Sequence, residues 1–192
     1  ALYFAPILRH NPKTPEDPDR DRLFLSNGHI CPIWYTTLAH AGYCSRTEML
    51  RSLRKMGSRL QGHPHRKALP PIENPSGPLG QGLSQATGYA YAARMDGKLF
   101  QVYCVLSDGE QEEGQTWESF MFAANNKLDN LTYVIDRNHI QIDGYTEEVM
   151  PLEPLVEKLE SFGLQVFEVD GHNMQAILDA FSHDASVHRK PV

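Results

Sequence analysis

Residues 100–109 read Phe100-Gln101-Val102-Tyr103-Cys104-Val105-Leu106-Ser107-Asp108-Gly109. The run up to Leu106 is largely apolar, which is typical of a strand covered on both faces of a sheet. A helical pattern follows from Thr116 to Asn126, and a second apolar run spans Leu131 to Ile135. Strand, helix and strand in this order predict two parallel strands joined by a crossover helix.

Further elements are predicted on both sides of this unit, and strand and helix continue to alternate toward the C-terminus. On the C-terminal side we expect three more elements: a helix over Leu152 to Phe162, a third strand over Leu164 to Val169 and a helix over Met174 to Phe181. On the N-terminal side, three helical patterns cover Ile30 to Tyr43, Arg46 to Met56 and Leu79 to Met95, with a proline-rich loop at residues 57–76. We therefore predict an α/β fold, a parallel sheet flanked by helices on both faces, with residues 1–192 as a single domain.

Both ends of the chain have the character of interrupted elements. Ala1 to Ala5 reads as the tail of a helix that lacks a cap before it, and Lys190-Pro191-Val192 stops where an apolar strand would normally begin. We expect the domain to be incomplete at both termini and to be part of a longer polypeptide.

Composition and charge narrow the class of protein. The formal net charge is -6, which argues against a nucleic-acid partner, because binding to phosphate backbones usually needs a basic face. No apolar run approaches the length needed to cross a bilayer, so we expect no membrane association. The three cysteines, Cys31, Cys44 and Cys104, lack metal-ligand spacing. They favour a reduced, cytoplasmic setting.

Polar side chains follow the two best-defined strands at the point where each strand ends. Asp108 and Gly109 follow the first strand, and Asn138 follows the second. Because parallel sheets bind ligands at the carboxyl ends of their strands, we expect these residues at one rim. Carboxylate and amide oxygens suit Mg²⁺ or Ca²⁺, and Gly109 permits close approach of a phosphate oxygen. The pattern favours a metal-bridged diphosphate site, although each segment alone is also an ordinary turn former.

These strand ends resemble the thiamine diphosphate motif, which runs from a Gly-Asp-Gly turn to an Asn after the next strand. Four further blocks resemble transketolase segments, in transketolase order: Asp21-Arg22 through Leu25-Ser26-Asn27-Gly28-His29, Gly57-Ser58-Arg59-Leu60-Gln61-Gly62-His63-Pro64, Ser76-Gly77-Pro78-Leu79-Gly80-Gln81-Gly82 and Gln141-Ile142-Asp143-Gly144. The resemblance covers the chain from about Asn11 to Phe181 and is to the N-terminal, diphosphate-binding half of transketolases.

The resemblance implies a set of cofactor-binding residues. Asp108 and Asn138 would ligate a divalent metal, Mg²⁺ or alternatively Ca²⁺ or Mn²⁺, together with the backbone carbonyl of Ile140. The N–H of Gly109 would donate to the diphosphate of thiamine diphosphate. In the Gly-Pro-Leu-Gly-Gln-Gly loop, Gly77 and Leu79 would lie against the central part of the cofactor.

The resemblance also implies the reaction and the partners. His29 and His63 match the active-site histidines, whose imidazoles can donate to a developing alkoxide or move a proton near neutral pH. The activity would transfer a two-carbon glycolaldehyde unit from a ketose phosphate to an aldose phosphate. It would need a pyrimidine-binding domain or subunit, in a homo- or hetero-oligomer, so that this chain alone is expected to be inactive.

Two features leave alternatives open. The first Gly of the motif is Ser107, which would cost about 1 kcal/mol if the position requires a positive φ. We expect the site to tolerate this substitution, which is the one feature in support of a non-catalytic transketolase-like relative; deoxyxylulose-phosphate synthase, the α chain of a 2-oxo-acid dehydrogenase and an unrelated nucleotide-binding domain are further alternatives. Glu113 and Glu118 match carboxylates near the subunit interface of the family. Equally, Glu110, Glu112 and Glu113 fit a solvated acidic helix start.

Overall fold

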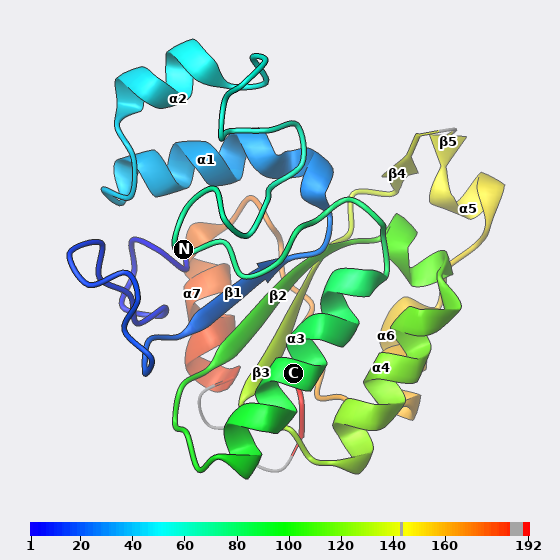
Figure 1. The fold of residues 1–192 in the computed structure, drawn as a ribbon. Helices are drawn as coiled ribbons and strands as arrows, with labels where there is room; N and C mark the ends of the chain where they lie inside the picture. Colours follow the sequence, from blue (N-terminus) through cyan, green and yellow to red (C-terminus); the bar gives the residue numbers. More distant parts are fainter. Residues whose placement is uncertain (143, 185–189) are drawn as a thin grey trace.

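The centre of the computed structural model is a three-stranded parallel sheet in the order β1-β2-β3 (Figure 1). The structure describes residues 1–142, 144–184 and 190–192. The strands are β1 (Arg22–Leu25), β2 (Val102–Ser107) and β3 (Leu131–Asp136). Val105 pairs with Leu25 on one side and with Val134 on the other, so β2 is the central strand.

Helices cover both faces of this sheet. The longer ones are α1 (Cys31–His40), α3 (Gln81–Met95), α4 (Gly114–Asn125), α6 (Leu155–Ser161) and α7 (Met174–Asp184). Cys104 and Leu106 of β2 point into the core formed with α3, α4 and α6. Tyr103 points the opposite way, into the core formed with α1, where it also meets Phe181 of α7. The predicted parallel sheet with helices on both faces is confirmed.

Shorter elements connect this framework. They are the 3₁₀ turns η1 (Gly28–Ile30) and η2 (Gly109–Glu112), the helices α2 (Arg46–Ser52) and α5 (Thr146–Val149), and the antiparallel pair β4 (Ile140–Gln141) and β5 (Gly144–Tyr145). The 3₁₀ turns and β4 follow the carboxyl ends of β1, β2 and β3, the end of the sheet at which parallel sheets bind ligands. Residues 57–76 contain no helix or strand, as expected.

Several helices are shorter than the hydrophobic pattern predicted, because the backbone turns at specific residues. Helix α3 begins at Gln81 rather than Leu79, since Gly80 adopts a left-handed conformation with φ of 74°. Helix α2 ends at Ser52 rather than Met56, since Arg54 has φ of 58°. Helix α6 begins at Leu155, after the extended Pro154.

The expected third strand over Leu164 to Val169 is wrong. No strand is assigned to these residues, and the position beside β3 is taken by the backbone of Val192. The N–H of Tyr133 donates to the Val192 carbonyl at 2.6 Å, and the Val192 N–H donates to the Leu131 carbonyl at 3.2 Å. Within this segment Leu164 is buried, whereas Phe167 and Val169 are 37% and 41% exposed, so it does not form a buried strand of the sheet.

The start of the chain also differs from the expectation. Residues 2–7 form hydrogen-bonded turns rather than the tail of a helix, with the Ala5 N–H donating to the Ala1 carbonyl at 2.9 Å. Asp143, in the fourth transketolase-like block, lies outside the described residues. Within the described ranges, no helix has both the length and the apolar character needed to span a membrane.

Candidate functional site

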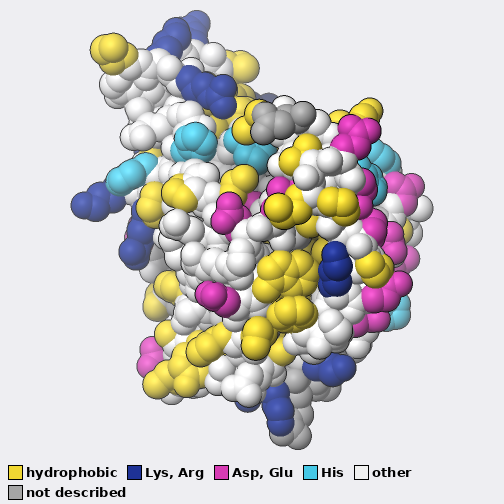
Figure 2. Space-filling model, turned by 90° about the vertical axis from the view of Figure 1, so that its right-hand side faces the viewer, with side chains coloured by type: hydrophobic (Ala, Val, Ile, Leu, Met, Phe, Trp, Pro, Cys, Tyr) yellow, Lys and Arg dark blue, Asp and Glu magenta, His cyan; other side chains and the backbone are white. Residues whose placement is uncertain are grey.

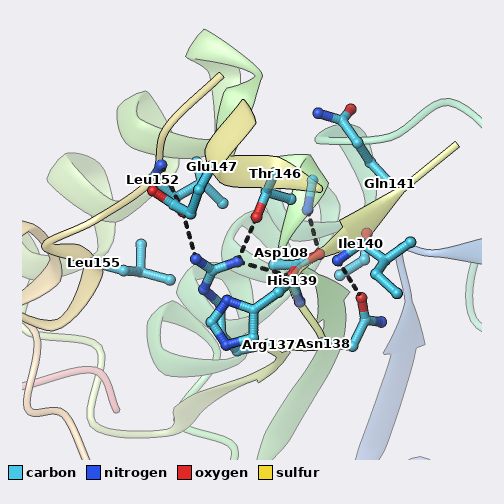
Figure 3. Close-up of polar contacts among 12 residues, drawn as sticks. Asp108, Arg137, Asn138, His139, Ile140, Gln141, Thr146, Glu147, Leu152 and Leu155 are labelled. Atoms are coloured by element: carbon cyan, nitrogen blue, oxygen red, sulfur yellow. Dashed lines mark hydrogen bonds and ion pairs between the residues drawn. The ribbon is translucent and has the colours of Figure 1, made fainter. Parts of the chain in front are cut away.

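The ends of β2 and β3 lie side by side and carry the residues expected to bind metal. Ser107 pairs with Asp136 in the register, and the Asp108 N–H donates to the Asp136 carbonyl at 3.2 Å. Asp108 is fully buried, whereas Asn138 is exposed to solvent. Figure 3 shows Asp108, Asn138 and Ile140 at this shared edge. The topology therefore brings the three predicted metal ligands together.

The Asp108 carboxylate accepts three hydrogen bonds, and all of them come from its own rim. Oδ1 accepts from the N–H of Gly109 at 2.8 Å. Oδ2 accepts from the N–H of His139 at 2.6 Å and from Nη1 of Arg137 at 3.0 Å. A buried carboxylate needs such donors, because desolvation penalises its charge. The Gly109 N–H, expected to serve a diphosphate, is directed at Asp108 in this structure.

Arg137 was not singled out from the sequence, yet it connects the rim to the segment around α5. Its guanidinium lies 2.6 Å from Oε1 of Glu147 and 2.8 Å from Oε1 of Glu153, and Nη1 also donates to Oγ1 of Thr146 at 2.7 Å. Partial burial lowers the pKa of Arg137, but hydrogen bonds to the carboxylates of Glu153, Asp108 and Glu147 outweigh it and raise the pKa above its usual value. The guanidinium is therefore a fixed positive charge beside Asp108.

The set of oxygen ligands at this rim fits a hard divalent cation. It comprises the Asp108 carboxylate, the amide oxygen of Asn138 and the backbone carbonyl of Ile140, and Oδ1 of Asp108 retains a lone pair beyond the Gly109 bond. The amide oxygen of Asn138 accepts from the Ile140 N–H at 2.9 Å, which folds these ligands into one turn. Across the described residues, no group of three or more His, Cys, Asp or Glu side chains could hold a metal. A cation here would need oxygens from a ligand, which is how proteins commonly hold Mg²⁺.

The second part of the site lies at the end of β1, where His29, His63 and Gly77 meet. A Cβ on Gly28 would be 2.5 Å from Cβ of Ser76, so only glycine allows the backbone before His29 to contact this loop. A Cβ on Gly77 would be 3.7 Å from Cγ of His63. The three predicted residues, from separate sequence blocks, thus share one neighbourhood.

The loop that carries His63 is fixed by α1, the helix that follows His29. The hydroxyl of Tyr35 donates to the carbonyl of Gln61 at 3.1 Å, and the thiol of Cys31 donates to the carbonyl of Gly62 at 2.9 Å. His29 and His63 are nevertheless exposed. The anchoring holds the backbone in place and leaves both imidazoles accessible to a ligand.

Buried polar groups without partners lie next to these histidines. The side-chain amide of Asn27 is buried and neither its oxygen nor its nitrogen is hydrogen-bonded within the described residues; the same holds for the hydroxyl of Ser76. Unpaired buried polar atoms are uncommon and costly in native proteins. The end of β1 therefore presents free hydrogen-bonding capacity beside the candidate site.

The remaining predicted residues are placed as follows. Leu79 is half-buried in the loop before α3. Ser107 is the last residue of β2 and is absent from the positive-φ positions, so it carries no glycine-like strain. Glu113 and Glu118 are exposed on α4 or just before it. Glu110 is instead fully buried, which contradicts its reading as part of a solvated acidic helix start.

A family model of the transketolase, thiamine diphosphate binding domain matches residues 1–192. The chain belongs to this transketolase family. By its description, this family is a thiamine diphosphate binding domain.

Similar curated proteins include separate transketolase subunits and complete transketolases. The chain is 42% identical over 191 residues to a 6-deoxy-6-sulfo-D-fructose transketolase subunit of Clostridium sp. (strain MSTE9), covering 100% of the chain and 69% of that protein. It is 42% identical to an apulose-4-phosphate transketolase subunit of Phocaeicola vulgatus, covering 100% of the chain and 67% of that protein. It is 37% identical to human transketolase, covering 94% of the chain and 29% of that protein.

Solved transketolases have the same fold. The transketolase from Leishmania mexicana superimposes with a TM-score of 0.91 at 32% sequence identity, over 99% of this chain and 30% of that one. The chain therefore spans about two thirds of the two transketolase subunits and less than a third of the complete enzymes.

Proposed function

We propose that this chain is the diphosphate- and metal-binding half of a transketolase that transfers a two-carbon ketol unit from a ketose phosphate to an aldose phosphate. The observation that supports the proposal most directly is the joint placement of Asp108, Asn138 and Ile140 at the ends of two adjacent parallel strands. The family match supplies the cofactor, thiamine diphosphate, for which this rim is suited.

Under this proposal the rim residues bind the diphosphate through a divalent metal. Asp108, Asn138 and the carbonyl of Ile140 would hold Mg²⁺, with Ca²⁺ or Mn²⁺ as substitutes. The N–H of Gly109 would turn from Asp108 toward a diphosphate oxygen. Gly77 and Leu79 would lie against the central part of the cofactor, where the absence of a side chain on Gly77 allows close approach.

The two histidines would act on the sugar. Bound thiamine diphosphate supplies a nucleophilic carbon for ketol transfer, since the cofactor carries the difficult chemistry and the protein orients it. His29 and His63 are exposed and lie in the neighbourhood of Gly77, so both imidazoles are open to a ligand bound there. We assign them to donating a hydrogen bond to, and exchanging a proton with, the hydroxyl and carbonyl oxygens of the sugar.

Completion of the site would require a pyrimidine-binding domain or subunit. Two similar proteins are named as transketolase subunits, which supports an arrangement in separate chains. Met121 and Phe122 of α4 are 59% and 44% exposed, and Figure 2 shows hydrophobic side chains gathered on the side of the molecule where α4 lies. Exposed apolar patches of this kind favour an interface.

The substrates would be sugar phosphates, and the apulose phosphate and sulfofructose relatives favour testing less common sugars as well.

The proposal is tested by titrating thiamine diphosphate, with Mg²⁺ and then with excess chelator, into the chain combined with a pyrimidine-binding transketolase subunit. We expect binding that disappears with chelator and in Asp108→Ala, while Asp96→Ala, at the far end of α3, binds like the wild type. Circular dichroism establishes that both variants are folded. Absence of binding to the folded wild type would refute the catalytic proposal and favour the non-catalytic relative.

A further inference from the structure

Glu110 is a fully buried carboxylate whose four hydrogen bonds come from neutral groups. Oε1 accepts from the hydroxyl of Ser26 and from the N–H of Gly80, the latter at 2.8 Å. Oε2 accepts from the N–H of Ser107 at 2.8 Å and from its hydroxyl at 3.4 Å. Among the described residues, Glu110 forms no ion pair with Lys, Arg or His. Its charge is stabilised by oriented donors and by the N-terminus of α3, which begins after Gly80.

These donors belong to three different segments of the proposed site. Ser26 directly follows β1 and lies shortly before His29. Gly80 closes the loop that contains Gly77 and Leu79, and Ser107 directly precedes Asp108. The segments are far apart in sequence, and the carboxylate of Glu110 contacts all three.

Further bonds fix Glu110 itself. Its backbone carbonyl accepts from Oγ1 of Thr116 at 2.8 Å, at the start of α4. The hydroxyl of Ser26 also accepts from the N–H of Gly82 at 3.2 Å, so the end of β1 is held against the first turn of α3. The carboxylate therefore lies at the centre of a rigid, buried junction.

We propose that Glu110 is a positioning residue that sets the relative placement of the diphosphate rim, the loop at Gly77 and the segment that carries His29. The inference rests on the proposed function, because it is the extended thiamine diphosphate molecule that would contact all three segments. Movement of one segment would leave the cofactor correctly bound at one end and displaced at the other. Glu110 acts only through the segments that it binds and contacts no substrate.

The chemistry of the junction requires a carboxylate. Both oxygens of Glu110 face donors, and a carboxylate is the side-chain group that accepts at both positions. A glutamine has the same shape but presents an N–H₂ group at one position, where it would meet the donor of Gly80 or of Ser107. Glu110→Gln is therefore a nearly isosteric substitution that releases one segment of the junction.

The test compares Glu110→Gln with Thr87→Val, which removes a buried hydrogen bond between α3 and Tyr133 without touching the three segments. Amide exchange measured by NMR, without cofactor, reports the junction directly. We expect exchange at Gly80 or Ser107 to accelerate about 10- to 100-fold in Glu110→Gln, with β3 amides unaffected. With Mg²⁺ and the pyrimidine-binding subunit, the Kd for thiamine diphosphate should rise about 10- to 100-fold.

Thr87→Val should lower the melting temperature without changing the Kd for thiamine diphosphate. If the wild type binds thiamine diphosphate and Glu110→Gln binds it with the same Kd, the inference is overturned. The inference is also overturned if the Kd rises equally in Glu110→Gln and in Thr87→Val. If the wild type itself does not bind, the proposed function fails, and the exchange rates at Gly80 and Ser107 still decide whether Glu110 holds the segments together. If Glu110→Gln does not fold, Ser26→Ala removes one donor to Glu110 and the acceptor of the Gly82 N–H, so it should accelerate exchange at Gly82 and raise the Kd for thiamine diphosphate.

Discussion

Nη1 of Arg137 lies 3.0 Å from Oδ2 of Asp108, the carboxylate expected to ligate the metal. The same guanidinium reaches Glu147 and Glu153, whose side chains are partly exposed. Arg137 thus supplies a positive charge beside the carboxylate that would ligate a divalent cation. The cation and the guanidinium compete for the negative charge of one buried group.

This competition predicts that Arg137→Met strengthens metal binding. The substitution removes a positive charge close to the metal and leaves two additional carboxylates unpaired, so we expect the affinity for Mn²⁺ in the presence of thiamine diphosphate to rise about tenfold. The fold should lose about 3 kcal/mol, because Asp108 is left buried without its counter-charge. Electron paramagnetic resonance of Mn²⁺ and chemical denaturation measure the two effects.

Arg94→Met is the matched control, since among the described residues the Arg94 guanidinium donates to the backbone carbonyls of Asn126 and Lys127 and to no carboxylate. It should leave the metal affinity unchanged. A weaker affinity in Arg137→Met would mean that orienting the rim matters more than the charge of the guanidinium.

Two glycines of α3 are predicted to respond in opposite directions to the same substitution. A Cβ on Gly82 would be 2.6 Å from Cα of Ser26, whereas a Cβ on Gly88 would meet nothing within 4 Å. Gly88→Ala should stabilise the protein by about 0.5–1 kcal/mol through helix propensity. Gly82→Ala should destabilise it by about 1–3 kcal/mol, because it separates α3 from the end of β1. Denaturant unfolding measures the change in the free energy of unfolding for both variants. Equal changes would show that helix propensity alone governs the response of α3.

The predictable part of the fold was the part decided by local pattern and topology. The apolar runs that became β2 and β3 are covered on both faces, and parallel pairing then requires that Asp108 and Asn138 emerge at one rim. The segment from Leu164 to Val169 was also expected to form a strand, although Gln165 and Glu168 interrupt its apolar residues. Its environment differs because Val192 occupies the edge of β3.

The parts of the site that the sequence did not predict depend on contacts between segments that are far apart in the chain. Glu110, Glu112 and Glu113 lie in one acidic stretch, and nothing local distinguishes the fully buried Glu110 from the half-buried Glu112 and the exposed Glu113. Burial of Glu110 follows from the meeting of β1, β2 and α3. Arg137 lies within a recognisable Asp-Arg-Asn run, but its carboxylate partners are supplied by the turn around α5.

The pair between Glu48 and Arg59 predicts a defined pH dependence of stability. Oε1 of Glu48 lies 2.6 Å from Nε of Arg59, and this hydrogen bond lowers the pKa of Glu48 below its usual value. Because the folded-state pKa is the lower one, the stabilisation is complete above the unfolded-state pKa of about 4.3 and is lost as the pH falls through the folded-state value. Glu48→Gln should cost about 0.5 kcal/mol at neutral pH. Unfolding measured from neutral pH downward should show the two proteins converging in acid; a constant difference would instead indicate a packing effect.

His63 provides the sharpest test of the proposed chemistry, because a second histidine lies two residues away. His63 is exposed and faces the loop at Gly77, whereas His65 has no assigned role and its Nδ1 accepts from the N–H of Lys67 at 3.3 Å. His63→Ala should leave folding and thiamine diphosphate binding intact and lower kcat/KM of the assembled transketolase about 100-fold, the scale of general acid–base catalysis. His65→Ala should retain activity. Equal losses in both variants would indicate disturbance of the loop over residues 57–76, and unchanged activity in His63→Ala would remove this histidine from the proposed mechanism.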